Sequence, residues 1–214
     1  MISLFVVLLL GYLAGSIPTA IIASRIAMKD DIRNHGSRNA GATNVFRVMG
    51  WKPALIVVLI DIGKGVLATL VFARIAVDAP VLSPFILQLL AGCAAIAGHI
   101  WTVFAQFRGG KGVGTAFGVL VGLAPAASLI TLGVWLILVF ATRIVSVGSI
   151  AAGLVFPLVL LIQKTVLKSP VPDGLLIMGI TLGFLIGVTH RANIRRLLRG
   201  EEHRFGSSRN KEGA

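Results

Sequence analysis

The residues best suited to bind a phosphate form a glycine-rich segment with one lysine, Phe107-Arg108-Gly109-Gly110-Lys111-Gly112-Val113-Gly114-Thr115. Glycines allow backbone N–H groups to converge on a tetrahedral anion, and a lysine supplies a positive point charge. An apolar stretch that predicts a helix follows at once, and a helix N-terminus adds the positive end of its dipole. The segment therefore predicts a phosphate-binding loop. The alternative is a flexible basic loop that only fixes membrane topology.

This glycine loop differs from the two common nucleotide-binding motifs. Ala105 stands where a Walker A loop needs its first glycine, and Gly112 follows Lys111 where that motif needs serine or threonine. The pattern Gly110-x-Gly112-x-x-Thr115 also leaves the dinucleotide-binding fingerprint incomplete. The loop is therefore expected to bind phosphate by a different arrangement.

The first polar cluster in chain order, with the glycine loop as the second, combines small residues, hydroxyls and amides in Gly36-Ser37-Arg38-Asn39-Ala40-Gly41-Ala42-Thr43-Asn44, followed by Arg47. It lies in a connection of about 26 residues without an apolar pattern, and loops of that length are often functional. Glycine, serine and asparagine also favour turns for local reasons. An ordinary turn with helix caps is therefore the alternative to a binding site.

A third polar cluster is His190-Arg191-Ala192-Asn193-Ile194-Arg195-Arg196. The apolar helix before it has a glycine every four residues, at Gly179, Gly183 and Gly187, which gives a flat stripe for close helix packing. His190 and then Asn193 follow at intervals of three residues on the same face, so both are expected to point into the helix bundle. Imidazole exchanges a proton near neutral pH, so His190 is a candidate acid or base, with a structural histidine as the alternative.

A few polar residues lie within or beside the apolar runs. Asp61 and Lys64 are three residues apart in one run, where ionisable groups are costly and usually form a pair that faces the bundle. His99 is expected to be structural. Ser146 and Ser149 join the polar clusters only if the chain crosses the membrane seven times.

The composition makes a water-soluble fold the least expected class. Of 214 residues, 56% are hydrophobic and only 13% are charged, against about 25% charged in an average soluble domain. The formal net charge of +12 comes from short basic clusters between long apolar runs. Such clusters are typical of membrane topology signals and anion sites rather than of a nucleic-acid-binding surface. Cys93 is the only cysteine, which excludes disulfides and Cys-based metal sites, and neither a metal nor a cofactor is expected.

The apolar runs predict an all-α integral membrane protein. A bilayer core about 30 Å thick needs roughly 20 apolar residues in a helix. Clear candidates run from about Ile2 to Ile26, Pro53 to Ala76, Pro84 to Phe107, Ile144 to Gln163 and Gly174 to Thr189. No lysine or arginine precedes Arg25, so the first run is expected to be a retained anchor. The basic residues after it predict a cytoplasmic connection and an external N-terminus: Lys29, Arg33, Arg38, Arg47 and Lys52.

The stretch Val113 to Ala141 is either one long helix or two short crossings that break around Gly122 to Pro125. One helix would place the basic residues from Arg191 to Arg199 outside, against the charge bias. Two crossings give about seven transmembrane helices and a cytoplasmic C-terminus, although Val113 to Ala124 would span only about 18 Å. We prefer the second interpretation, with residues 1–200 as a single transmembrane catalytic domain and residues 201–214 as a polar cytoplasmic tail.

The three clusters, in this order, resemble the PlsY family of bacterial acyl-phosphate:glycerol-3-phosphate acyltransferases over nearly the whole chain. The matching residues are Gly36-Ser37-x-Asn39-x-Gly41-Ala42-Thr43-Asn44 with Arg47, Asp61-x-Gly63-Lys64-Gly65, Gly98-His99 leading to Gly109-Gly110-Lys111-Gly112, and His190-Arg191-x-Asn193-Ile194 with Glu201. The departures are modest. Trp101-Thr102, Arg108 and Gly114 stand where the family commonly has Phe-Pro, lysine and alanine.

The resemblance implies a seven-helix fold with an external N-terminus and an active site facing the cytoplasm, in the bacterial cytoplasmic (inner) membrane. The implied reaction moves a fatty acyl group from acyl phosphate to the 1-hydroxyl of glycerol 3-phosphate, which gives lysophosphatidic acid and phosphate. This is the first acylation step of bacterial phospholipid synthesis. The implied partners are these two substrates and the lipid bilayer, without nucleic acid.

The resemblance also implies catalytic roles for Ser37, Arg47, Lys111, His190 and Asn193, with Glu201 supporting the structure. Further contacts to the substrates are expected from Asn39, Thr43, Asn44, Gly109, Gly110, Gly112, Thr115 and Ser149. The glycine loop would take the donor phosphate while Arg47, Ser37 and the face of His190 orient the acceptor, or the two assignments are reversed.

An acyl phosphate is already activated, so the alignment of two substrates can supply much of the rate without a covalent acyl-enzyme. The base is either His190 or a phosphate oxygen of the donor. The alternative function is a small anion or organophosphate transporter, which would use the same basic and glycine-rich segments. Transporters tend to show paired half-repeats with a site at the bilayer midplane, and this sequence shows neither feature.

Overall fold

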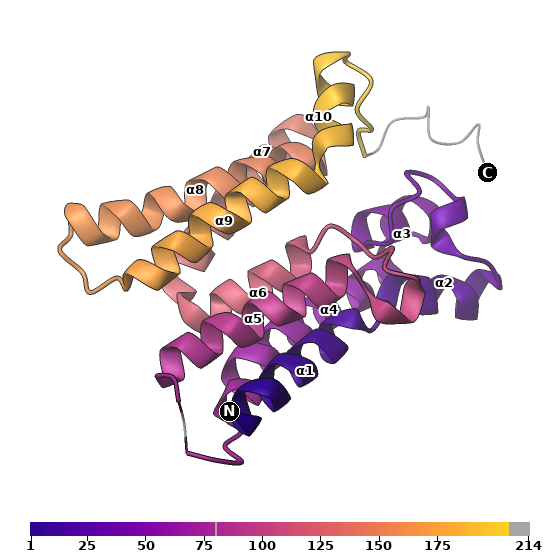
Figure 1. The fold of residues 1–214 in the computed structure, drawn as a ribbon. Helices are drawn as coiled ribbons and strands as arrows, with labels where there is room; N and C mark the ends of the chain where they lie inside the picture. The colour runs from indigo at the N-terminus through magenta and orange to yellow at the C-terminus, as the bar shows by residue number, and fades with distance from the viewer. Residues whose placement is uncertain (80, 206–214) are drawn as a thin grey trace. The chain divides into compact units, whose positions relative to one another are not determined.

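The computed structural model describes residues 1–79 and 81–205, and every regular element in these ranges is helical. The α-helices are α1 (Ile2–Ser16), α2 (Thr19–Met28), α3 (Ala42–Met49), α4 (Trp51–Leu70), α5 (Pro84–Ile100), α6 (Val113–Leu123), α7 (Pro125–Thr142), α8 (Val145–Thr165), α9 (Asp173–Thr189) and α10 (Arg191–Leu198) (Figure 1). Three short 3-10 helices join them, η1 (Ile32–Asn34), η2 (Phe72–Arg74) and η3 (Val103–Ala105).

The described helices form two compact units, and the single catalytic domain expected over residues 1–200 remains a prediction. Unit 1 is Met1–Leu123, and unit 2 begins at Ala124 and includes the described residues up to Phe205. The predicted polar tail is described only as far as Phe205, and its remaining residues, 206–214, lie outside the described part of the chain.

In unit 1, α1 packs along α5 and α4 packs along α6. The helices approach closely because glycines remove side chains at the crossings. A Cβ added at Gly98 of α5 would overlap the carbonyl of Tyr12, and one at Gly118 of α6 would overlap the carbonyl of Ile62. The contact between Gly98 and Tyr12 brings the C-terminal ends of α1 and α5 to the same end of unit 1, where the first and second polar clusters follow.

Proline explains two interruptions of the apolar runs. Pro18 has no N–H and disfavours helical backbone at Ile17. The first predicted crossing is therefore divided into α1, which ends at Ser16, and α2, which begins at Thr19. In the second case α6 ends at Leu123 and α7 begins at Pro125, so the predicted break in the stretch Val113 to Ala141 is confirmed.

In unit 2, α8 packs against both α7 and α9. The glycine stripe of α9 is used in part for this packing. A Cβ at Gly183 would overlap the carbonyl of Gly153 in α8, whereas one at Gly187 would meet no atom within 4 Å. The prediction of close backbone packing is therefore confirmed at Gly183 but is wrong at Gly187.

Five helical segments in the described residues are long and apolar enough to cross a membrane: Ile2–Met28, Trp51–Arg74, Pro84–Ala105, Pro125–Thr142 and Val145–Thr165. A sixth results if α9 and α10, which meet at a bend of 62°, count as one span. The helix α6 is apolar but has only 11 residues. The prediction of an all-α integral membrane protein is thus confirmed, while the count of seven crossings and the orientation of the termini remain predictions.

Candidate active site

The glycine loop is fixed against the C-terminal end of α5. The N–H of Gly109 donates to the carbonyl of Ile100 at 3.0 Å, and the N–H of Gly110 donates to the carbonyl of His99 at 3.1 Å. A Cβ added at Gly110 would lie only 2.7 Å from the carbonyl oxygen of Ala40, and closer still to Nε2 of His99. The loop therefore contacts both α5 and the first polar cluster, which it could not do with larger residues.

The same loop leads into the N-terminus of α6. Gly112 has φ +79°, a backbone conformation that favours glycine, and its carbonyl accepts the N–H of Ala116 at 2.7 Å to begin the helix. Lys111, directly before Gly112, is partly exposed. The first N–H groups of a helix have no acceptor within the helix and attract anions. Lys111 thus stands next to the start of α6, and phosphate binding there remains a prediction.

Arg33 joins the first and second clusters within unit 1. Its Nη1 donates to the carbonyls of Ala105 and Arg108, both at 3.1 Å. Asp31 holds the other side of the guanidinium through Nε at 3.0 Å and Nη2 at 2.8 Å. The hydrogen bonds from Arg33 are also the main reason why the pKa of Asp31 lies below its usual value. The sequence analysis treats Arg33 only as a topology signal, whereas the structure shows that it connects two loops.

Asn44 organises the loop that carries Ser37. Its Oδ1 accepts the backbone N–H of Ser37 at 2.8 Å, and its Nδ2 donates to the carbonyls of Ile32 and His35 at 3.1 and 3.0 Å. The side chain is buried, and these bonds use both ends of the amide. The expected contact of Asn44 with substrate is therefore replaced by a role in holding the loop.

The other predicted residues of the first cluster are partly exposed at this end of unit 1. Ser37 and Asn39 lie in the loop before α3, and Thr43 and Arg47 lie on α3 itself. The helix α3 begins after Gly41, so the polar loop and Arg47 belong to one short folded segment. The structure thus brings the first and second clusters together, as the sequence predicts, with these four residues partly buried.

A buried polar cluster lies next to the glycine loop. Asp61 and Lys64 form an ion pair with 2.7 Å between Oδ1 and Nζ, and the two residues are only 4% and 3% exposed. Lys64 Nζ also donates to the carbonyl of Ile17 at 2.6 Å. Thr19 donates its hydroxyl to Asp61 Oδ1 at 3.0 Å. The predicted ion pair is confirmed. It contacts Ile17 and Thr19, which lie on either side of the break between α1 and α2.

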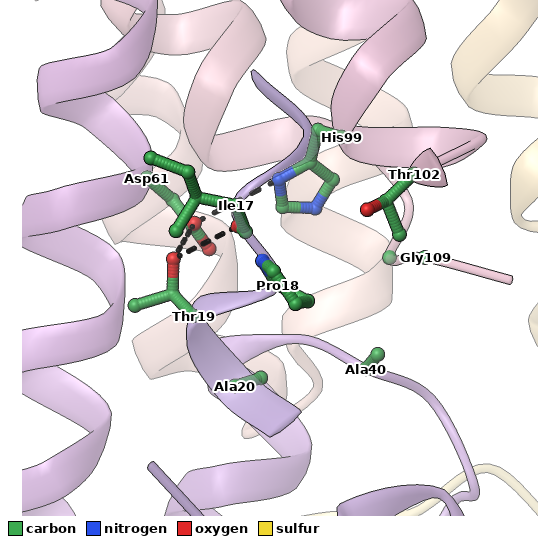
Figure 2. A pocket seen from close by; sticks show the side chains of 10 residues that line it. Ile17, Pro18, Thr19, Ala20, Ala40, Asp61, His99, Thr102 and Gly109 are labelled. Atoms are coloured by element: carbon green, nitrogen blue, oxygen red, sulfur yellow. Dashed lines mark hydrogen bonds and ion pairs between the residues drawn. The ribbon is translucent and has the colours of Figure 1, made fainter. Parts of the chain in front are cut away.

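A small pocket is lined both by this cluster, through Thr19 and Asp61, and by the loop, through Gly109 and Gly110. Figure 2 shows Asp61, Thr19 and His99 directed toward one another beside it, with Gly109 on the loop side. Nδ1 of His99 is 3.1 Å from Oγ1 of Thr115 and 3.7 Å from Oδ1 of Asp61. Thr115, whose hydroxyl is expected to contact phosphate, is instead fully buried against His99.

The third cluster lies in unit 2, where α9 bends into α10. His190 is 3% exposed, and its Nδ1 is 2.9 Å from the carbonyl of Ile186. Because a carbonyl only accepts hydrogen bonds, Nδ1 carries the hydrogen and the neutral ring has its lone pair on Nε2.

Asn193 is 5% exposed, so the prediction that His190 and Asn193 point into the protein is confirmed. Asn193 Nδ2 donates to Oε1 of Glu202 at 2.8 Å, and Nε of Arg196 donates to Oε2 of the same carboxylate at 2.8 Å. The resemblance implies a supporting role for Glu201, but Glu201 is exposed and Glu202 makes these contacts. The supporting carboxylate is therefore one residue later than expected.

Two serines near the start of α8 differ in their contacts. Ser149 Oγ donates to the carbonyl of Val145 at 3.1 Å and accepts the indole N–H of Trp135 at 3.3 Å, so its expected contact with phosphate is replaced by packing within unit 2. Ser146 is 5% exposed, and its Oγ has no hydrogen-bond partner among the described residues. A buried, unpartnered hydroxyl at a helix N-terminus is suited to an anion.

The same end of unit 2 carries the third cluster and the start of α8. The N–H of Phe205, which follows α10, donates to the carbonyl of Arg143, which lies between α7 and α8, at 3.0 Å. This contact agrees with the predicted placement of Arg143 and the C-terminal segment on one side. Among the described residues no group of three or more His, Cys, Asp and Glu side chains is arranged to hold a metal ion.

Residue types alone assign no site role to Arg33 or Glu202, and they place Ser146 with the polar clusters only if the chain crosses the membrane seven times. A weak signal exists for Arg33, because Asp31 stands two residues before it and a carboxylate at that spacing can fix a guanidinium. Glu202 offers no such signal, because its position depends on how the chain turns after α10. Ser146 is distinguished only by its lack of a partner, which is visible in the structure alone.

Comparisons with known proteins all point to one family. The sequence profile of the family described as Glycerol-3-phosphate acyltransferase matches residues 5–200. A glycerol-3-phosphate acyltransferase of Chlorobium phaeobacteroides (strain BS1) is 43% identical, with 95% of this chain and 97% of that protein covered. A glycerol-3-phosphate acyltransferase of Chlorobium luteolum (strain DSM 273 / BCRC 81028 / 2530) is 44% identical, with 97% of this chain and 100% of that protein covered.

Two crystal structures of PlsY, an integral membrane glycerol 3-phosphate acyltransferase, have the same fold. The glycerol 3-phosphate form has a TM-score of 0.83 and 37% identity, with 96% of each chain covered. The lysophosphatidic acid form has a TM-score of 0.78 and 36% identity, again over 96% of each chain. The family profile, the sequence relatives and the fold all agree, and the chain belongs to the glycerol-3-phosphate acyltransferase family.

Proposed function

We propose that this protein transfers a fatty acyl group from an acyl phosphate to the 1-hydroxyl of glycerol 3-phosphate. The products are lysophosphatidic acid and inorganic phosphate. The observation that carries the proposal is the glycine loop, in which Lys111 stands at the N-terminus of α6 and the backbone is held against α5 and Ala40. Membership of the acyltransferase family supports the reaction, and the loop supports a phosphate-bearing donor.

Electrostatics explains why the site needs several positive groups. Acyl phosphate and glycerol 3-phosphate each carry close to two negative charges at neutral pH, so they repel one another when they are brought together. The glycine loop with Lys111 is assigned to the donor phosphate. Arg47 and Ser37 are assigned to the acceptor, because a guanidinium can hold two phosphate oxygens at once. The loop bonds of Asn44 and Arg33 keep these groups at one end of unit 1.

In the reaction the acceptor hydroxyl oxygen attacks the carbonyl carbon of the acyl phosphate. The bond between that carbon and the phosphate oxygen breaks, and phosphate leaves with the electron pair. The hydroxyl proton passes either to a phosphate oxygen of the donor or to the imidazole of His190. No covalent acyl-enzyme is needed, because the donor is already activated and alignment lowers the barrier.

In unit 2, Asn193 and His190 are assigned to orientation of the acceptor, with Glu202 fixing the amide of Asn193. The unpartnered hydroxyl of Ser146 at the start of α8 is a further candidate for contact with a phosphate oxygen. We assign the active site to the cytoplasmic side of a bacterial inner membrane, since the basic connections of the sequence carry the topology signal for that side. Seven crossings, with α6 as a short one, would satisfy the same signal.

The proposal is tested with the purified protein in lipid vesicles. Acyl phosphate, acyl-CoA and an acyl carrier protein thioester are supplied separately with glycerol 3-phosphate, and lysophosphatidic acid is measured by mass spectrometry. We expect lysophosphatidic acid only when acyl phosphate is the acyl donor. Product only with a thioester would refute the donor assignment. Transport of glycerol 3-phosphate into the vesicles without consumption of acyl phosphate would refute the proposed acyl transfer and would favour a transporter.

Lys111→Ala tests the phosphate-binding loop within this assay. We expect turnover to be abolished while the thermal unfolding temperature in detergent stays close to that of the wild type, because Lys111 is partly exposed. Lys168→Ala is the matched control, since Lys168 is an exposed lysine in the connection between α8 and α9. Wild-type activity in Lys111→Ala would eliminate the loop as the phosphate site.

A further inference from the structure

The buried cluster next to the glycine loop has no part in the reaction as proposed. It nevertheless places a carboxylate and an ammonium inside apolar helices, where ionisable groups are costly unless they have a purpose. Lys64 uses Nζ on three acceptors, namely Asp61, the carbonyl of Ile17 and the hydroxyl of Thr19. Because these polar groups are paired with one another, the cluster forms a rigid support at the loop end of unit 1.

His99 connects this buried cluster to the glycine loop in two ways. Its ring lies between the cluster and the loop, with Nδ1 at 3.1 Å from the hydroxyl of Thr115 and Nε2 beside the position that a Cβ of Gly110 would take. Its backbone carbonyl accepts the N–H of Gly110 at 3.1 Å. A change in the orientation of His99 would therefore move the backbone that ends in Lys111.

We infer that the Asp61–Lys64 pair and Thr115 hold His99 in one orientation, and that His99 in turn sets the backbone position of the phosphate-binding loop. His99 is then a positioning residue, because it acts through Gly110 rather than on the reacting atoms. The inference rests on the proposed function in one respect, that the glycine loop binds phosphate. It adds a second layer of residues to that site which the family profile match alone does not assign.

Thr115→Val tests the inference because it removes the hydroxyl that contacts His99 and keeps the branched shape. The matched control is Thr69→Val on α4. Thr69 is equally buried, but its hydroxyl donates only to carbonyls of its own helix, to Gly65 at 3.0 Å and to Val66 at 3.1 Å. Thr115→Ser is the conservative variant that keeps the hydroxyl. All three are purified in detergent, and unfolding temperature is recorded for each.

Two readouts separate positioning from stability. The first is the dissociation constant of inorganic phosphate by isothermal titration calorimetry, which needs no turnover. The second is the split between kcat and KM for acyl phosphate. For Thr115→Val we expect phosphate affinity about tenfold weaker and KM about tenfold higher, which corresponds to one lost hydrogen bond in the support of the loop. Thr115→Ser and Thr69→Val are expected to stay within about twofold of the wild type.

Phosphate affinity in Thr115→Val equal to that of the wild type would overturn the inference, as would an equal loss in Thr69→Val. If Thr115→Val does not fold, the double variant Asp61→Asn/Lys64→Met replaces it, because it removes both charges together and leaves neither one unpaired. We expect this variant to fold with weakened phosphate affinity, and unchanged affinity would again contradict the inference. A wild-type protein that binds phosphate but makes no lysophosphatidic acid would refute the proposed function alone.

Discussion

The substitution Gly110→Ala adds a single methyl group at the point where the glycine loop meets both α5 and the first polar cluster. The new Cβ would lie 2.7 Å from the carbonyl oxygen of Ala40, which is 0.7 Å less than the 3.4 Å at which ordinary contact begins. The contact with His99 Nε2 is tighter still. Ala40 contributes backbone and cannot rotate away, so the loop itself must move by several tenths of an ångström.

A displacement of this size is large for catalysis that depends on alignment. A misplacement of about 1 Å can cost about a hundredfold in rate, so a shift of 0.7 Å is expected to lower kcat/KM by between about tenfold and about a hundredfold. The effect on stability is expected to be small, because the loop is at the surface end of unit 1 and no core side chain is removed. Both quantities are measured on purified protein, by formation of lysophosphatidic acid and by thermal unfolding.

Gly63→Ala is the control for this prediction. Gly63 lies on α4 in the same unit, and a Cβ there would meet no atom within 4 Å. An alanine in a helix interior is favoured over glycine by about 0.5–1 kcal/mol, so this variant should be at least as stable as the wild type and fully active. Wild-type kcat/KM in Gly110→Ala would show that the loop tolerates displacement and would refute the argument from its geometry.

Two further predictions concern the supports of the loops. Asn44→Ala removes three hydrogen bonds, to the backbone of Ser37, Ile32 and His35. At roughly 1 kcal/mol for each bond, the free energy of unfolding should fall by about 3 kcal/mol. A decrease below about 1 kcal/mol in denaturant titration would contradict this account. The pKa of Asp31 is lowered chiefly by Arg33, so its contribution to stability is present above the unfolded-state pKa of about 3.9 and disappears as the pH falls through the lowered value. Asp31→Asn should therefore reduce the unfolding temperature at neutral pH and weaken its acid dependence, and an unchanged acid profile would exclude Asp31 as a contributor.

Much of the fold could be predicted because lipid imposes a simple pattern. Apolar runs of the right length give the spanning helices, and the proline at position 125 marks a helix boundary that the structure confirms. The effect of Pro18 is harder to anticipate, because a proline near the end of an apolar run can kink a helix or divide it. The structure shows division, and the reason lies in tertiary contacts, since Lys64 binds the carbonyl of Ile17 at the break.

The candidate site was predictable at the level of clusters and less so at the level of single side chains. Residue types identify the glycine loop and the buried pair of His190 and Asn193. They do not show whether a polar side chain contacts substrate or neighbouring backbone. Asn44 and Thr115 read as substrate ligands in the sequence, yet their hydrogen bonds are taken up within the protein. The choice between Glu201 and Glu202 depends on the turn after α10, which has no periodic signal.

Helix interruptions explain why the polar residues gather where they do. Inside a bilayer every backbone N–H and carbonyl must be satisfied by the protein itself. At the break after α1 the carbonyl of Ile17 is satisfied by Lys64, and at the bend after α9 the carbonyl of Ile186 is satisfied by His190. Both carbonyls also accept a backbone N–H at 2.9 Å, from Thr19 and from His190 respectively, so each polar side chain adds to a contact that the main chain already makes. Lys64 lies beside the glycine loop and His190 lies at the bend between α9 and α10, so we propose that the groups that contact the interrupted helices also support the proposed site.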